Sequence, residues 1–181
     1  MNNDIERVLY SEEEIQTRIG EMAKQIEKDY ADKRPMVISV LTGAILFTVD
    51  LLEKADIYTT LDFIDVSSYF GAAESSGRVE LVRDLKSDVK GKDILICEDI
   101  IDSGRTLQYL VDLLKKRGAK SIKVATMLDK PAGRDKDVTV EADYAGFLVP
   151  NEFLVGYGLD YDGYYRNLPY VGILKKEVYS K

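Results

Sequence analysis

The residues best suited to chemistry lie together between positions 98 and 106. Three carboxylates and two hydroxyls fall within this stretch: Glu98, Asp99, Asp102, Ser103 and Thr106. A turn that contains glycine and opens a helix offers backbone N–H groups and a positive dipole end, which together suit a phosphate. Carboxylates beside such a site would repel the phosphate unless they faced sugar hydroxyls or a divalent cation. The stretch therefore favours a ribose phosphate with a metal-bound part nearby.

The flanking residues predict the elements that position this stretch. Ile94 to Cys97 is a short, β-branched apolar run, as expected of a strand buried on both faces. After the turn, apolar residues recur at helical spacing, at Leu107, Leu110, Val111 and Leu114. A strand, an acidic turn and a helix start form the crevice in which open α/β sheets hold ligands.

The same alternation extends over the first two-thirds of the chain. Ser11 and Glu14 form a capping box before a helix with an inner stripe at Ile15, Ile19, Met22, Ala23 and Ile26. A second helix is expected from Ile45 to Lys54, after a turn at Thr42-Gly43-Ala44. Further strands are predicted at 36–41, 61–66, 79–82, 121–127, 144–149, 153–157 and 171–174. The pattern predicts an α/β fold with a mostly parallel sheet, in one domain over residues 1–181.

Composition narrows the chemistry. The chain has no histidine, one cysteine and a net charge of −7. Imidazole bases, Ser-His-Asp triads and zinc sites with histidine or several thiolates are therefore excluded, and any metal should be a hard cation on oxygen ligands, magnesium before zinc. The acidic balance weighs against nucleic-acid binding. No apolar run is long enough for a membrane span, and the polar N-terminus is unlike a signal peptide, so a cytoplasmic location is expected.

Residues 94–107, ILICEDIIDSGRTL, resemble the phosphoribosyl-pyrophosphate motif of type I phosphoribosyltransferases at every defined position. Three more segments resemble the hypoxanthine-guanine branch of that family: residues 41–44, Ser68-Tyr69, and residues 153–161 followed by Arg166. The resemblance implies a mostly parallel twisted sheet flanked by helices, with a small hood built from the terminal segments. It also implies transfer of a phosphoribosyl group from phosphoribosyl pyrophosphate to a 6-oxopurine, with Mg²⁺, in a homodimer or homotetramer.

The resemblance assigns roles residue by residue. It places the ribose hydroxyls and magnesium at Glu98 and Asp99, and the 5′-phosphate on the loop of Asp102, Ser103, Gly104, Arg105 and Thr106. It places pyrophosphate at Thr42, Gly43 and Arg166, although many members have lysine or arginine where Thr42 stands. It lines the purine site with Lys130, Phe153, Leu154 and Asp160, of which Asp160 is also the expected ligand of a second magnesium.

Two roles follow from position. Asp102 lies at the mouth of the phosphate loop and is the candidate acid or base at the purine ring, since no histidine is present. Residues 67–77, with Ser68 and Tyr69, are either a lid over the reaction or a plain connector.

Other functions remain open on the sequence. A regulatory protein that senses nucleotides could use the same fold, but it would need a DNA-binding domain or a basic face. An adenine or orotate phosphoribosyltransferase is disfavoured by Lys130 and the segment from Phe153 to Asp160.

Overall fold

The structure is a computed structural model that describes residues 1–68 and 79–180. Within these residues the main element is a twisted sheet of order β4-β3-β2-β5-β6-β7. Its strands are β2 (Met36–Leu41), β3 (Thr60–Ser68), β4 (Val79–Arg83), β5 (Asp93–Ile101), β6 (Ser121–Asp129) and β7 (Tyr144–Leu148). Neighbouring strands run parallel except for β3 and β4, which are antiparallel. The predicted mostly parallel sheet is confirmed.

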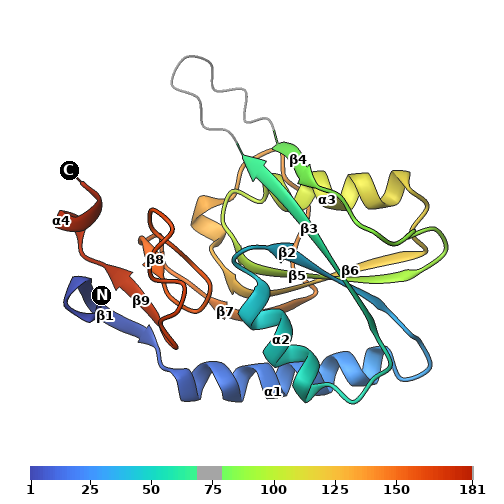
Figure 1. The fold of residues 1–181 in the computed structure, drawn as a ribbon, viewed down its shortest axis with the longest axis horizontal. Helices are drawn as coiled ribbons and strands as arrows, with labels where there is room; N and C mark the ends of the chain where they lie inside the picture. Colours follow the sequence, from blue (N-terminus) through green and yellow to red (C-terminus); the bar gives the residue numbers. More distant parts are fainter. Residues whose placement is uncertain (69–78, 181) are drawn as a thin grey trace.

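Helices cover both faces of this sheet (Figure 1). α1 (Glu12–Asp29) and α2 (Ile45–Lys54) pack on one face, and α3 (Arg105–Lys116) packs on the other. Successive residues of β5 enter the two cores in turn: Leu95 and Cys97 face α1 and α2, whereas Ile94 and Ile96 face α3. Burial on both faces is why this strand is apolar without a break.

The start of α1 is as predicted. Ser11 and Glu14 form the reciprocal capping box, and the five expected stripe residues are buried. Arg18, on the same helix, donates to the carbonyl oxygens of Ala145 and Gly146 on β7, at 2.8 and 2.9 Å. Because β7 ends the sheet, this arginine occupies hydrogen-bond acceptors that an edge strand would otherwise expose.

A second, smaller sheet is built from the two ends of the chain. It has the order β1-β9-β8, with β1 (Ile5–Tyr10), β9 (Val171–Leu174) and β8 (Leu154–Val155) antiparallel. It stands beside the main sheet with the N-terminus and α4 (Lys176–Tyr179) (Figure 1). Two 3₁₀ turns complete the elements, η1 (Asn2–Asp4) and η2 (Pro131–Gly133). The expected hood of terminal segments is confirmed.

Three sequence-based expectations need correction. β1 was not predicted, because most of its side chains are exposed and it lacks alternation. The strand expected from Phe153 to Tyr157 contains only Leu154 and Val155, since Gly156 and Tyr157 have positive φ. β5 runs four residues beyond Cys97, paired with β6 up to Ile101 and Asp129. Glu98 and Asp99 therefore lie in a strand and not in the turn after it.

Among the described residues, no helix combines the length and apolarity needed to cross a membrane.

Candidate active site

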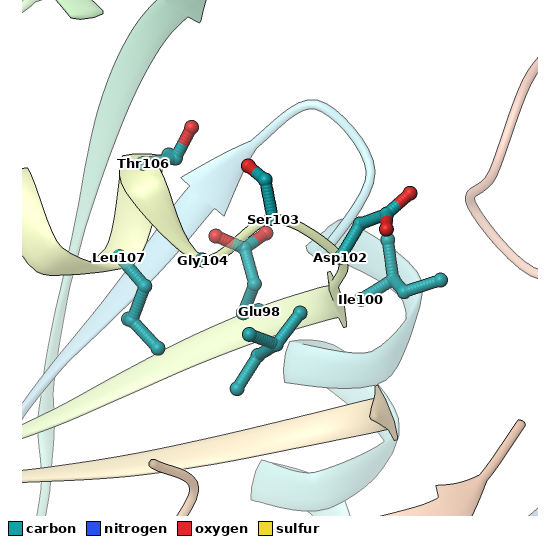
Figure 2. A pocket seen from close by; sticks show the side chains of 8 residues that line it. Glu98, Ile100, Asp102, Ser103, Gly104, Thr106 and Leu107 are labelled. Carbon is teal, nitrogen blue, oxygen red and sulfur yellow. The ribbon is translucent and has the colours of Figure 1, made fainter. Parts of the chain in front are cut away.

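A cavity of about 310 Å³ lies where β5 passes into α3. All of its lining comes from one stretch of chain: Glu98, Ile100, Ile101, Asp102, Ser103, Gly104, Thr106 and Leu107. Figure 2 shows Glu98 rising from β5 toward the loop, Ser103 at the loop, and Thr106 on the first turn of α3. Gly104 has φ +79 and is the N-cap of α3, a left-handed conformation that glycine adopts without strain. We call this space the first cavity.

Two neighbouring carboxylates of β5 are taken out of water at this end of the sheet. Burial raises the pKa of Glu98 well above its usual value, and the charge of Asp99 raises it further. Burial also raises the pKa of Asp99, whereas the nearby Arg166 opposes that rise. The two adjacent acids disfavour each other's charged form. A cation or a group of hydroxyl donors placed between them would relieve this repulsion.

A second cavity, also of about 310 Å³, adjoins the first and shares Ile100 and Asp102 with it. The rest of its lining comes from segments distant in sequence: Asp99, Lys130, Glu152, Phe153, Leu154, Leu159 and Asp160. Lys130 Nζ lies 2.6 Å from Asp102 Oδ2, so the lysine after β6 pairs with the aspartate of the loop after β5. Lys130 is mostly buried, whereas half of the Asp102 side chain remains exposed.

Phe153 is held from outside the second cavity by two tyrosines. Its ring stacks on Tyr179 with centroids 4.7 Å apart, and Tyr161 meets it edge-on at 5.5 Å. Neither tyrosine lines the cavity, so the remaining ring face of Phe153 is the one available to a flat ligand.

Two turns meet beside the second cavity. Arg166 Nη2 pairs with Asp160 Oδ1 at 2.8 Å, and Arg166 Nη1 donates to the carbonyl oxygen of Gly158 at 2.6 Å. Gly43 packs so closely that a Cβ there would overlap the Asp99 carboxylate, and a Cβ at Gly158 would overlap the Gly43 carbonyl. Thr42 is exposed in the turn before α2. The structure thus brings Gly43 and Arg166 next to the two cavities without placing them in the lining.

The structure separates some of the expected residues from the rest. The Arg105 side chain pairs with Asp135, so only its backbone belongs to the loop. Ser68 is the last residue of β3, and Tyr69 to Gly77 lie outside the described residues. Within the described part of the chain, no group of three or more Asp, Glu, His or Cys side chains is arranged to hold a metal ion. The carboxylates Glu98 and Asp99 remain the candidate ligands.

Sequence reasoning missed Arg134. This arginine pairs with Asp129 at the end of β6, and its Nη1 donates to the carbonyl oxygen of Asp102 at 3.4 Å. It lies in the turn-rich loop after β6, where composition alone does not distinguish it from surface arginines. Ile100, Glu152 and Leu159 also line the cavities and carried no signal.

Comparisons with known proteins agree with this arrangement. The phosphoribosyl transferase domain family matches residues 9–162. The hypoxanthine-guanine phosphoribosyltransferase of Bacillus subtilis is 54% identical over 180 residues, covering 99% of both chains. A crystal structure of a hypoxanthine phosphoribosyltransferase from Staphylococcus aureus superposes with a TM-score of 0.94 at 46% identity, covering 100% of this chain and 97% of that one.

Some relatives are much longer. The bifunctional protein TilS/HprT of Listeria innocua is 58% identical over all 181 residues, yet the chain spans only 28% of that protein's length.

Proposed function

Because this chain belongs to the phosphoribosyltransferase family, in its hypoxanthine-guanine branch, we propose that it is a purine salvage enzyme. It transfers the phosphoribosyl group of phosphoribosyl pyrophosphate to hypoxanthine or guanine, giving IMP or GMP and pyrophosphate. The bond from the ribose anomeric carbon to pyrophosphate breaks, a bond to the purine nitrogen forms, and the base loses a ring N–H proton. The observation that carries the proposal is the pair of adjoining cavities that share Asp102.

The first cavity suits the ribose 5′-phosphate. Its loop offers the hydroxyls of Ser103 and Thr106 and the backbone N–H groups at the start of α3. Glu98 reaches the same cavity from β5 and can accept hydrogen bonds from ribose hydroxyls. The charge separation that accompanies departure of pyrophosphate is best stabilised by groups already in place, as these are.

The second cavity suits the purine. Phe153 presents one ring face to the cavity, and Lys130 can donate to an oxygen at purine C6. When Lys130 turns to this oxygen, its ion pair with Asp102 loosens and the carboxylate becomes free to accept the ring proton. The pair therefore keeps the acid–base group next to the base site before the substrate arrives. The backbone of Leu154 lies at the same wall.

Magnesium fits the carboxylate pair of β5. Glu98 and Asp99 are oxygen ligands of the kind Mg²⁺ prefers, and their raised pKa values show that nothing in the described chain neutralises them fully. When bound, the cation would offset the negative charge of the pyrophosphate group. Asp160 faces the same region but is engaged by Arg166 and by the backbone N–H of Gly163 at 2.8 Å. It would have to exchange these partners to hold a second magnesium.

We also propose that the enzyme works as a homodimer or homotetramer in the cytoplasm. The face of α2 that carries Ile45, Leu46 and Val49 is exposed and apolar, which is typical of an interface with another chain. Light scattering after gel filtration measures the mass directly, and a monomeric mass would contradict the proposal.

The test of function is an assay with magnesium, phosphoribosyl pyrophosphate and each of hypoxanthine, guanine, xanthine and adenine. Nucleoside monophosphate should form from hypoxanthine or guanine and not from adenine. A regulatory protein on the same fold would instead bind phosphoribosyl pyrophosphate or a nucleotide without turnover. Binding without product from all four bases would therefore overturn the proposal in favour of that alternative.

A further inference from the structure

Three successive residues after β8 have left-handed backbone conformations. Gly156, Tyr157 and Gly158 have φ of +95, +49 and +98. The turn is tied to the segment that follows it, since Tyr157 N donates to the Leu168 carbonyl at 2.9 Å and Gly158 N donates to that of Arg166 at 3.0 Å. A non-glycine residue in this conformation is sparsely populated and persists only where its surroundings hold it. The surroundings of Tyr157 are therefore informative.

The Tyr157 side chain reaches away from the cavities into the core under α2. It is 6% exposed, and its hydroxyl donates to Asp50 Oδ2 at 2.6 Å. The same oxygen accepts a hydrogen bond from Gln16 Nε2 at 2.5 Å, so α1, α2 and the turn after β8 converge on one carboxylate. Burial and the neighbouring Asp50 raise the pKa of Tyr157, which keeps its hydroxyl protonated and able to donate.

The two ends of this contact lead to the two turns beside the second cavity. Asp50 lies on α2, which follows directly from the turn of Thr42 and Gly43. Tyr157 precedes Gly158, whose carbonyl accepts from Arg166 and whose Cα abuts the Gly43 carbonyl. A helix and a tightly bonded turn are both stiff, so the hydrogen bond between them sets the separation of the Thr42–Gly43 turn from Arg166.

We propose that Asp50 is a positioning residue: by holding the Tyr157 hydroxyl, it fixes the gap in which the pyrophosphate group is gripped. The inference rests on the proposed function, because it assigns pyrophosphate to Thr42, Gly43 and Arg166. Asp50 itself touches no substrate. Binding energy for a group held between two turns depends on their spacing, and small misplacements lower it steeply.

The chain contains a matched control for a purely structural role. Tyr144, at the start of β7, is 5% exposed and donates its hydroxyl to Asp29 Oδ2 on α1 at 2.5 Å. This is the same chemical contact at similar burial, but it lies at the amino end of the parallel strands, opposite the two cavities. Removing either hydroxyl should lower stability by a similar amount, roughly 0.5–1.5 kcal/mol for a net hydrogen bond.

The experiment compares Tyr157→Phe, Asp50→Leu, Asp50→Asn and Tyr144→Phe in the full chain. For each we would measure the KM for phosphoribosyl pyrophosphate, inhibition by inorganic pyrophosphate with magnesium, and the affinity for GMP, which lacks the pyrophosphate group. Tyr157→Phe and Asp50→Leu should weaken the first two by about 10-fold while GMP affinity changes less than about 2-fold. Asp50→Asn keeps an acceptor oxygen and should recover most of the loss.

Tyr144→Phe should lower the melting temperature without changing either pyrophosphate constant. If Tyr157→Phe behaved like Tyr144→Phe, with lowered stability and unchanged pyrophosphate binding, the contact would be structural and the inference wrong. A uniform loss of GMP and pyrophosphate affinity would also overturn it. Failure of the proposed function is distinguishable, because the unmodified chain would then show no turnover at all.

Discussion

The two cavities differ in how the chain builds them. The first is lined by residues 98–107 alone, whereas the second collects residues from the loops after β5 and β6 and from the segment after β7. The first is therefore specified by local structure: a strand, a glycine turn and a helix start. The second exists only when the loop after β6 and the segment that carries β8 are both docked. One is a local motif and the other a product of the tertiary fold.

They also differ in charge. At the first cavity Glu98 has a raised pKa beside Asp99, with no basic side chain paired to it in the described part of the chain. At the second cavity each prominent charge has an opposite partner, Lys130 with Asp102 and Arg166 with Asp160. The first cavity is thus prepared for a cation. The second must exchange internal ion pairs for contacts with its ligand.

Asp102 belongs to both cavities, and its replacement should have the largest effect. Asp102→Asn keeps the shape but cannot accept a proton, so kcat should fall by about 10²–10⁴. Nucleotide affinity, measured by calorimetry with GMP, should change little because the loop backbone is preserved. Near-normal turnover in this variant would remove Asp102 from the chemistry and leave the two cavities without a shared reactive group.

Lys130 tests the second cavity alone. Its ammonium has three donors and no acceptor, so it satisfies a 6-oxygen but not a 6-amino group. A mismatched donor pair in a dehydrated site costs roughly 1–3 kcal/mol or more, which predicts at least about 10²-fold preference for hypoxanthine over adenine. Lys130→Gln should narrow that preference, measured as the ratio of kcat/KM values for the two bases. An unchanged ratio would mean that another group, such as the backbone at Leu154, reads the base.

Gly158 tests the contact between the turns. Gly158→Ala would place a Cβ against the Gly43 carbonyl in a residue with φ +98. The backbone strain alone costs about 1–3 kcal/mol, and the overlap must also push the turns apart. We expect reduced stability together with a KM for phosphoribosyl pyrophosphate raised by about 10-fold.

The matched control is Gly163→Ala, which has φ +79 but nothing within 4 Å of the added carbon. It should cost stability alone. Equal KM values for the two alanine variants would show that the turns do not need their close packing.

Glu98 should give the smallest effect, and one of opposite sign. Its raised pKa means that its charge is disfavoured in the folded state, so Glu98→Gln should raise the melting temperature in EDTA at neutral pH. The rise should be roughly 2–4 °C for each kcal/mol recovered. As pH falls toward the carboxyl's unfolded value of about 4.3, the native glutamate takes up its proton and the difference should vanish. A lower melting temperature at neutral pH would contradict the repulsion seen at this pair.

The sequence predicted the first cavity better than the second, for the same physical reason. The strand before Glu98, the left-handed Gly104 and the stripe of α3 are local consequences of residue type, and all three are present. The pairing of Lys130 with Asp102 and the close approach of Gly43 to Asp99 depend on which strands become neighbours, which no local pattern encodes. β1 was missed because its stability comes from pairing with β9. Arg134 was missed because only the fold brings it to the Asp102 carbonyl.

The pairing of β1 with β9 has a consequence for how the protein is made. Ile5 is aligned with Leu174, and Lys175 Nζ donates to the Asn3 carbonyl at 2.6 Å. During synthesis β1 therefore leaves the ribosome first and must wait for nearly the whole chain before its partner exists. Contacts this distant in sequence close slowly. The parallel core can form meanwhile, and the small sheet that carries Leu154 at the second cavity is completed last. A ribosome stalled before residue 171 would thus hold a nascent chain with its first cavity built and its second still open.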